Sequence, residues 1–309
     1  MQKYIHCFYL ILFPFLSFSQ ELYSKSFGKQ TDPAVVFLHG GPGYNSANFE
    51  VITAEALAQS GFFVVVYDRR GEGRSANVPA SFTFEETFSD LSAIIEKYQV
   101  KQPTLLGHSF GGIVATLFAA RNPQQVKNIV LLGAPVSLQK TFKTIIKSCK
   151  SMYQAKNDNV NLQYINALER MDAAGIEYSS YCFYHAMQNN FYSPKQPTSE
   201  AQQLYSLFGT DATLKKYASK MSYEAPQGFW KHEKYTTLNL ISTIENLLKS
   251  GVIVRGIYGK DDGLYSAEQV AQLQQLLGSD QLLYWDSCSH YVFIDQRSRF
   301  ITALNNWLK

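Results

Sequence analysis

The stretch from residue 104 to residue 121 constrains the fold more than any other part of the sequence. It begins with the apolar run Thr-Leu-Leu at 104–106, continues as Gly-His-Ser-Phe-Gly at 107–111, and ends in a small, apolar helical stretch before Pro123. A serine flanked by glycines between a strand and a helix is typical of a turn too tight for bulky neighbours. The sequence therefore predicts that Ser109 stands exposed on a strand–helix turn, at the positive end of the helix.

Short apolar runs alternate with stretches of helical periodicity along most of the chain. Runs that are apolar at every position suit strands buried on both faces, as in a parallel sheet covered by helices. The alternation therefore predicts an α/β fold with a mainly parallel sheet flanked by helices. The expected strands are 34–38, 62–67, 104–106, 129–132, 252–258 and 282–285, and the expected helices are 83–98, 111–121, 266–277 and 297–309.

The segment from residue 137 to residue 249 interrupts this alternation. It contains helical stretches rich in tyrosine and no clear strand pattern. We predict a helical cap over residues 137–249, inserted before the strand expected at 252–258, and an α/β core formed by residues 20–136 and 250–309. The alternative is an ordinary second helical domain without a catalytic role, because aromatic residues more often form a core than contact a ligand.

Residues 1–19 have the pattern of a secretory signal peptide. Lys3 is followed by the apolar run CFYLILFPFL at 7–16 and then by small residues that end at Ser19. The run is shorter than the roughly 20 residues that span a membrane, and Pro14 interrupts it. We therefore expect cleavage after Ser19, no stable membrane span in the mature chain, and a secreted or periplasmic location. The alternatives are an uncleaved anchor or a buried strand.

The composition excludes several classes of protein. Hydrophobic residues make up 46% of the chain and charged residues 17%, which excludes an intrinsically disordered chain. The 28 basic and 25 acidic residues nearly balance, so the sequence predicts no nucleic-acid partner. It shows no phosphate-binding loop and no metal-ligand spacing, so it implies no cofactor and no metal.

Three cysteines would remain in the mature chain. Export would place Cys149, Cys182 and Cys288 in an oxidising compartment, where they allow at most one internal disulfide. A bridge between Cys149 and Cys182 is conceivable because both belong to the expected cap. The alternative, which we favour, is three free and buried thiols.

Ser109 needs a general base, because a serine hydroxyl is a weak nucleophile at neutral pH. After a serine on this kind of turn, the acid and then the histidine follow along the chain. His290 follows the last expected strand, where a loop can carry its ring back over Ser109, so we expect it to act as general base and then as general acid. Asp262 follows the strand expected at 252–258 and is the candidate for the acid that orients the imidazole. Asp261 is the competitor, and the one that is not used should be a solvated turn residue.

A glycine-rich loop follows the first expected strand. Its sequence, His-Gly-Gly-Pro-Gly at 39–43, can turn backbone amides inward. We predict that the amides of Gly41 and Phe110 form an oxyanion hole, because the loop falls where such a donor is expected beside this type of nucleophile turn. The alternative is an ordinary glycine turn.

Together these motifs resemble the α/β-hydrolase superfamily over nearly the whole mature chain, and most of all its prolyl iminopeptidase family. That family carries HGGPG, found here at 39–43, and then a DxRGxGxS segment, found here at 68–75 as DRRGEGRS. The resemblance implies the α/β-hydrolase fold, a helical cap, and a serine peptidase that removes N-terminal residues, often proline, from small peptides. The chain departs from the family at the serine, where GHSFGG replaces the tryptophan-containing GGSWG and matches a form common in esterases.

The family also recognises the free amine of its substrate through carboxylates of the cap. The cap of this chain offers four candidates, Glu169, Glu177, Glu224 and Glu233. Each could equally be a solvated charge on a helix face. The sequence therefore leaves peptidase specificity open.

The sequence supports one leading hypothesis about function and two alternatives. We expect a serine hydrolase with a Ser109–His290–Asp262 triad and an acyl-enzyme intermediate, exported and acting on short peptides as an aminopeptidase of prolyl iminopeptidase type. The first alternative is a carboxylesterase that uses the same triad on a small ester. The second is a non-enzymatic binding protein, against which the complete set of serine, histidine and aspartate argues. The expected partner is a small-molecule or short-peptide substrate, and no oligomeric state is predicted.

Overall fold

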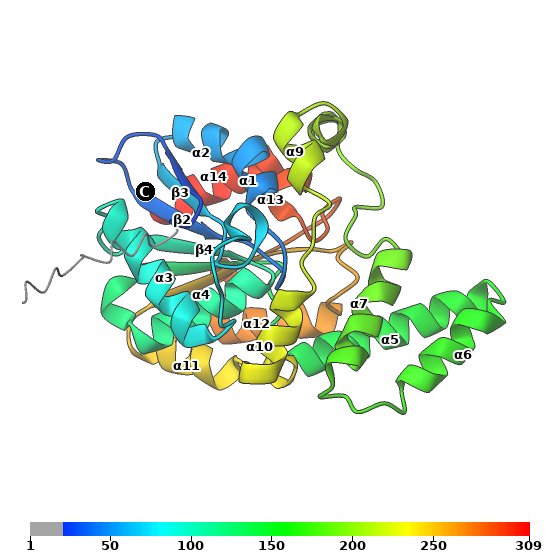
Figure 1. The fold of residues 1–309 in the computed structure, drawn as a ribbon. Helices are drawn as coiled ribbons and strands as arrows, with labels where there is room; N and C mark the ends of the chain where they lie inside the picture. The colour runs from blue at the N-terminus through cyan, green and yellow to red at the C-terminus, as the bar shows by residue number, and fades with distance from the viewer. Residues whose placement is uncertain (1–20) are drawn as a thin grey trace, which may run out of the picture.

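The structure is a computed structural model that describes residues 21–309. Within this range a seven-stranded sheet forms the centre of the molecule, in the order β1-β3-β2-β4-β5-β6-β7 (Figure 1). The strands are β1 (Ser24–Phe27), β2 (Ala34–Leu38), β3 (Phe63–Tyr67), β4 (Thr104–His108), β5 (Asn128–Leu132), β6 (Ile253–Gly259) and β7 (Leu282–Trp285). All neighbouring strands are parallel except β1 and β3. The predicted signal peptide at 1–19 lies outside the described residues.

The predicted strands are confirmed, and their ends differ from the prediction by at most two residues. Successive side chains of each strand point to opposite faces of the sheet, and each face has its own hydrophobic cluster. Along β2, Val36 and Leu38 belong to the cluster on one face, whereas Val35 and Phe37 belong to the cluster on the other. Both faces are buried because helices cover both, and this explains why the strands are apolar at successive positions.

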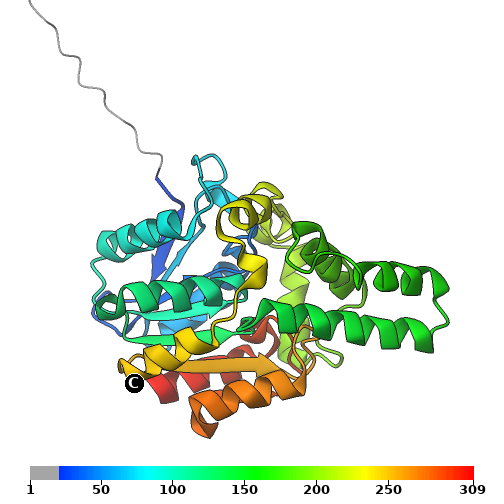
Figure 2. The same ribbon diagram turned by 90° about the horizontal axis from the view of Figure 1, so that it is seen from below.

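Helices cover the two faces of the sheet as separate layers (Figures 1 and 2). One face carries α3 (Phe84–Lys97), α4 (Phe110–Arg121), α11 (Ile241–Lys249) and α12 (Ala267–Leu277). The other carries α1 (Ala47–Phe49), a π-helical turn (Glu50–Ala54), α2 (Glu55–Gln59), α13 (Val292–Asp295) and α14 (Arg297–Leu308). The four helices that the sequence predicted correspond to α3, α4, α12 and α14. Within the described part of the chain, none of the helices combines the length and the apolar character needed to cross a membrane.

Most of the chain between β5 and β6, as far as α10, forms a helical region at one end of the sheet. Its helices are α5 (Leu138–Ala155), α6 (Asn159–Leu168), α7 (Ile176–Gln188), α8 (Ser199–Ser206), α9 (Ala212–Tyr217) and α10 (Glu224–Glu233). Helices α5, α6 and α7 extend away from the sheet as an arm, which both views show (Figures 1 and 2). Helix α8 packs against α13, and α9 packs against α1. Cys149 and Cys182, which lie in this region, are free and buried, as is Cys288.

Two elements differ from the expectation. Strand β1 was not predicted, because its sequence SKSF has no apolar run: it pairs with β3 alone, at the edge of the sheet, and none of its residues is fully buried. Helix α11 falls inside the predicted cap boundary of 137–249, yet it packs against α4 and β6. The helical region that stands over the end of the sheet therefore ends before residue 241.

An aromatic cluster joins the sheet to the layer of α1, α13 and α14. Phe49 is fully buried and stacks on Phe37 with 3.9 Å between ring centroids, while its edges meet Phe293 and Phe300 at 5.2 and 6.4 Å. We predict that Phe49→Ala lowers the free energy of unfolding by about 3–5 kcal/mol, because it removes a large buried ring and leaves a cavity.

Urea unfolding of the purified chain measures this effect. The matched control is Tyr164→Ala, which removes an aromatic ring that is 61% exposed on α6 and should change the free energy by no more than about 0.5 kcal/mol. Equal losses in the two variants would contradict the assignment of this cluster to the core.

Candidate active site

Ser109 lies at the turn between β4 and α4 with a strained backbone. Its φ of 51° and ψ of −123° place a non-glycine residue in the left-handed half of conformational space, which costs free energy and is typical of functional sites. A Cβ on Gly107 would collide with the backbone of Gly112, and a Cβ on Gly111 would collide with the carbonyl of Leu38. The two glycines are therefore required by the close approach of helix and strands at this turn.

A short hydrogen bond joins two of the predicted site residues in the loops that follow β6 and β7. His290 Nδ1 lies 2.8 Å from Asp262 Oδ2, and both side chains are almost completely buried. The second oxygen of Asp262 accepts the amide of Leu264 at 3.0 Å, which fixes the carboxylate. Asp261 points elsewhere, because its carboxylate accepts the amide of Lys195 at 3.1 Å. The structure thus pairs His290 with Asp262 and not with Asp261.

The backbone brings His290 beside the Ser109 turn. The ring of His108, the residue before the serine, packs on the ring of His290 with 4.8 Å between centroids, and His108 Nε2 donates to the His290 carbonyl at 3.1 Å. The Ser109 amide donates to Leu132 at 3.0 Å, and a Cβ on the following residue, Gly133, would lie 3.3 Å from His290 Nδ1. Among the hydrogen bonds of residues 21–309, none joins the Ser109 hydroxyl to the imidazole, a bond that often tightens only when substrate binds.

The glycine-rich loop after β2 lies against the serine. A Cβ on Gly40 would be 3.1 Å from the Cβ of Ser109. The amide of Phe110 is the first of α4, where backbone N–H groups are free and the helix dipole is positive. Neither this amide nor that of Gly41 donates a hydrogen bond to a partner within residues 21–309. The two predicted oxyanion-hole donors are thus unpaired and belong to the two segments that flank Ser109.

The cap contacts both loops that carry the pair. In the segment between α7 and α8, the carbonyl of Phe191 accepts the amide of Gly263 at 3.0 Å, and the carbonyl of Tyr192 accepts the hydroxyl of Ser289 at 2.8 Å. The ring of Tyr192 stands edge-on to the ring of His290 with 5.0 Å between centroids. This segment of the chain therefore packs against both loops that carry the pair.

Asp295 is a buried residue near the site that the sequence reasoning missed. Its carboxylate accepts the amide of Ser289 at 2.7 Å and the hydroxyl of Tyr205 from α8 at 2.6 Å. It also lies 2.8 Å from the Ser289 hydroxyl, whose single proton it shares with the Tyr192 carbonyl. Burial raises the pKa of the Asp295 carboxyl, and these hydrogen bonds oppose the rise. The network holds the backbone directly before His290, and no motif in the sequence indicates it.

Residues 33–296 match the sequence model of a protein family whose members have the alpha/beta hydrolase fold. The chain belongs to this family. It is 23% identical over 308 residues to the proline iminopeptidase of Lactobacillus helveticus, with 96% of each chain covered. It is 24% identical over 298 residues to the proline iminopeptidase of Lactobacillus delbrueckii subsp. bulgaricus, with 93% of this chain and 94% of the relative covered.

Solved structures share the fold of this α/β-hydrolase. The proline iminopeptidase-related protein of Thermus thermophilus matches with a TM-score of 0.62 and 22% identity, over 93% of this chain and 94% of its own. An esterase from Exiguobacterium antarcticum matches with a TM-score of 0.58 and 19% identity, over 93% of this chain and 95% of its own. Family membership and these relatives identify the chain as a hydrolase.

The four cap carboxylates considered for amine recognition in this α/β-hydrolase either have other partners or are exposed. Glu169 pairs with Lys150 at 2.7 Å, and Glu233 accepts the amide of Phe84 at 2.6 Å. Glu177 and Glu224 are exposed. Across residues 21–309, His, Cys, Asp and Glu side chains also form no group of three that could hold a metal ion.

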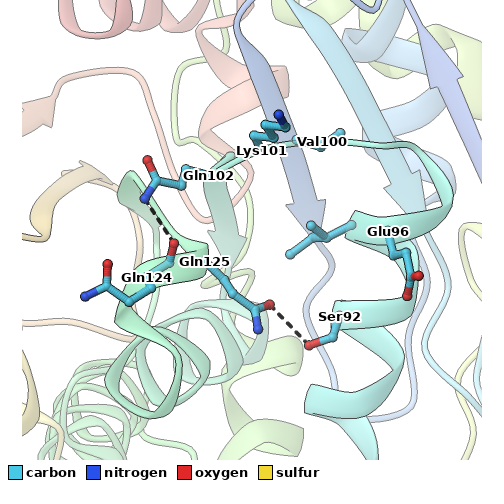
Figure 3. Close-up of a pocket in the computed structure, with 8 residues that line it drawn as sticks. Ser92, Glu96, Val100, Lys101, Gln102, Gln124 and Gln125 are labelled. Carbon is cyan, nitrogen blue, oxygen red and sulfur yellow. Dashed lines mark hydrogen bonds between the residues drawn. The ribbon is translucent and has the colours of Figure 1, made fainter.

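An open hollow of about 560 Å³ lies away from the serine (Figure 3). It is bordered by α3, by the loop before β4 and by the turn after α4, where Gln102 donates to the Gln124 carbonyl at 3.0 Å. These residues lie where β4 begins, whereas Ser109 follows the end of β4. The size of this hollow therefore says nothing about the substrate.

Burial of His108 makes a testable contribution to the pH dependence of stability. Burial, with His290 beside it, holds the pKa of His108 well below its usual 6.5, so the folded protein keeps this ring neutral. The unfolded chain takes up a proton as the pH falls through about 6.5, so stability present at higher pH is lost on acidification. At pH 5 this loss is at most about 2 kcal/mol.

We predict that His108→Gln removes this dependence. The difference in unfolding free energy between variant and wild type should move in favour of the variant by up to about 2 kcal/mol from pH 8 to pH 5, measured by urea unfolding. The control His232→Gln changes an exposed histidine on α10 and should keep the wild-type dependence. If the difference in unfolding free energy between His108→Gln and wild type stayed constant with pH, His108 would have the same pKa in the folded and unfolded chains.

Proposed function

We propose that this α/β-hydrolase is a serine hydrolase whose catalytic triad is Ser109, His290 and Asp262. The observation that carries the proposal is the buried 2.8 Å hydrogen bond between His290 and Asp262, next to a serine held in a strained turn. Ser109 itself is half-buried and not exposed as the sequence predicted. A buried carboxylate that orients an imidazole beside a serine hydroxyl is the arrangement that makes serine nucleophilic.

The geometry of the pair defines the direction of proton transfer. Asp262 accepts from Nδ1 of His290, so this nitrogen carries the proton and Nε2 is left as an acceptor. Nε2 takes the Ser109 proton as Oγ attacks the substrate carbonyl, and it then gives that proton to the leaving group, whose bond to the acyl carbon breaks. Water attacks the resulting acyl-enzyme, with His290 again as base, and the acid product and free Ser109 are released.

Two backbone amides would stabilise the negative charge that develops on the carbonyl oxygen of the substrate. The amides of Gly41 and Phe110 come from the two segments that flank Ser109, and both are unpaired within the described chain. The Phe110 amide also carries the positive end of the α4 dipole. Each such donor typically contributes about 2.7–4 kcal/mol to lowering the barrier.

For the substrate, we propose a short peptide from which the enzyme removes the N-terminal residue, as an exported aminopeptidase of prolyl iminopeptidase type. The support is the HGGPG loop, the DRRGEGRS segment and the near full-length similarity to two proline iminopeptidases. Export is proposed from the signal-peptide pattern of residues 1–19, which supports a location in a periplasm or outside the cell.

A carboxylesterase is the second candidate, and a specific observation favours it. Two of the four cap carboxylates that could hold a free amine are occupied by other partners, and two are exposed. The GHSFGG turn also lacks the tryptophan of the prolyl enzymes. A small ester has no free amine, so it needs no further carboxylate for binding, and the same triad would hydrolyse it.

The triad assignment predicts the ranking of two neighbouring substitutions. Asp262→Asn should lower kcat by up to about 10⁴-fold, because the amide no longer fixes the imidazole tautomer. Asp261→Asn is the matched control, since its carboxylate faces Lys195, and it should leave kcat within about threefold of wild type. Steady-state kinetics on p-nitrophenyl acetate measures both, with Ser109→Ala as the inactive reference. The reverse ranking would exchange the two roles.

The substrate class is tested by comparing amide and ester turnover. Proline p-nitroanilide, a panel of other aminoacyl anilides and p-nitrophenyl acetate are assayed with wild type and Ser109→Ala. Aminopeptidase activity predicts Ser109-dependent cleavage of the anilides and no cleavage when the amine is acetylated. Ester turnover without any anilide cleavage would reject the aminopeptidase and leave the carboxylesterase.

A further inference from the structure

A buried ion pair lies behind the glycine-rich loop. Arg69 and Glu72 are 3% and 0% exposed, and they form two parallel hydrogen bonds, Nε to Oε1 at 3.0 Å and Nη2 to Oε2 at 2.9 Å. They occupy the first two of the three open positions in the DxRGxGxS pattern, so the motif itself does not specify them. Two charges removed from water need further hydrogen bonds to be stable there.

Those further hydrogen bonds go to the glycine-rich loop. Arg69 Nη1 donates to the carbonyl of His39 at 2.5 Å, and Nη2 donates to the carbonyl of Gly40 at 2.6 Å. Glu72 Oε2 accepts the amide of Gly43 at 2.8 Å. The pair thus holds the loop on both sides of Gly41.

The bond to Gly40 determines where the Gly41 amide points. The carbonyl of Gly40 and the N–H of Gly41 belong to one planar trans peptide, so they point in opposite directions. With the carbonyl held by Arg69, the N–H is turned away from the guanidinium. Gly40 itself lies against Ser109, where a Cβ would approach the serine Cβ to 3.1 Å.

We propose that the Arg69–Glu72 pair positions the oxyanion hole by holding the Gly40–Gly41 peptide with its N–H free to stabilise the transition state. This inference rests on the proposed function, in which Gly41 is one of the two donors. The side-chain hydrogen bonds of Arg69 and Glu72 within residues 21–309 go to each other and to the glycine-rich loop, and none goes to the triad, so we assign them as positioning residues. Preorganised donors of this kind act mainly on the transition state, so disturbing them lowers kcat more than it changes KM.

The chain supplies a matched control next to the pair. Arg70 forms the same two-bond geometry with Asp90, at 3.0 and 2.6 Å, but it is 29% exposed and does not contact the glycine-rich loop. Arg70→Gln therefore removes a similar ion pair from the same segment without affecting the Gly40–Gly41 peptide.

The test compares Arg69→Gln, Arg69→Lys and Arg70→Gln with wild type. For each we measure kcat and KM on p-nitrophenyl acetate, and the Ki of a trifluoromethyl ketone and of the methyl ketone of the same shape. Ser109 Oγ adds to the carbonyl carbon of the fluorinated ketone, its proton passes to His290 Nε2, and the ketone oxygen becomes an oxyanion. The methyl ketone reports ground-state binding. A Ki does not depend on the fraction of folded enzyme, so it separates positioning from misfolding.

In Arg69→Gln we expect kcat to fall, and the Ki of the fluorinated ketone to rise, by between about tenfold and the 10²–10³-fold that loss of one donor costs. KM and the Ki of the methyl ketone should stay within about threefold. Arg69→Lys should show an intermediate loss, because one ammonium group cannot span both carbonyls and Glu72. Arg70→Gln should match wild type.

Arg69→Lys keeps the buried charge beside Glu72, so it serves as the deciding variant where Arg69→Gln fails to fold. A wild-type Ki for the fluorinated ketone in Arg69→Lys, with turnover still dependent on Ser109, would overturn the positioning role alone. Wild-type turnover that survives Ser109→Ala would instead overturn the proposed function and this inference with it.

Discussion

The buried hydrogen bond between His290 and Asp262 is the interaction on which the site depends. It requires the loops after β6 and β7 to meet, and their meeting is fixed by the parallel pairing of these strands at the edge of the sheet. Because neither side chain is open to water, the carboxylate keeps the imidazole in one tautomer and orientation. The Ser109 turn, the cap and the network around Asp295 all contact one or both of these loops.

Much of this arrangement could be predicted from the sequence, because its causes are local. Strands buried on both faces must be apolar at every position, so the strands from β2 to β7 were recognisable. The serine turn needs glycine at positions where helix and strand backbones nearly touch, so its motif was visible. Chain order after the serine then identified His290 and Asp262 as candidates, and the structure places them together.

The remaining parts depend on contacts between distant segments, which leave no periodic signal. Strand β1 is polar because it lies at an edge, so only its pairing with β3 defines it. The sequence of helix α11 gave no sign that separated it from the helices before it, and only its packing on α4 and β6 places it on the sheet. Asp295 and the Arg69–Glu72 pair are charged and buried. Nothing in the sequence around them indicates that they are buried. Sequence alone would assign such charges to the surface.

The attachment of the cap limits how this enzyme can diversify. The segment between α7 and α8 contacts both catalytic loops through main-chain oxygens, those of Phe191 and Tyr192. The oxygens themselves do not depend on residue type, but the ring of Tyr192 also packs against His290, so side chains constrain this segment as well. Helices α5 and α6 form no hydrogen bond with either loop within residues 21–309, so they are free of this constraint. An insertion at 191–192, by contrast, would displace the acid and the base together.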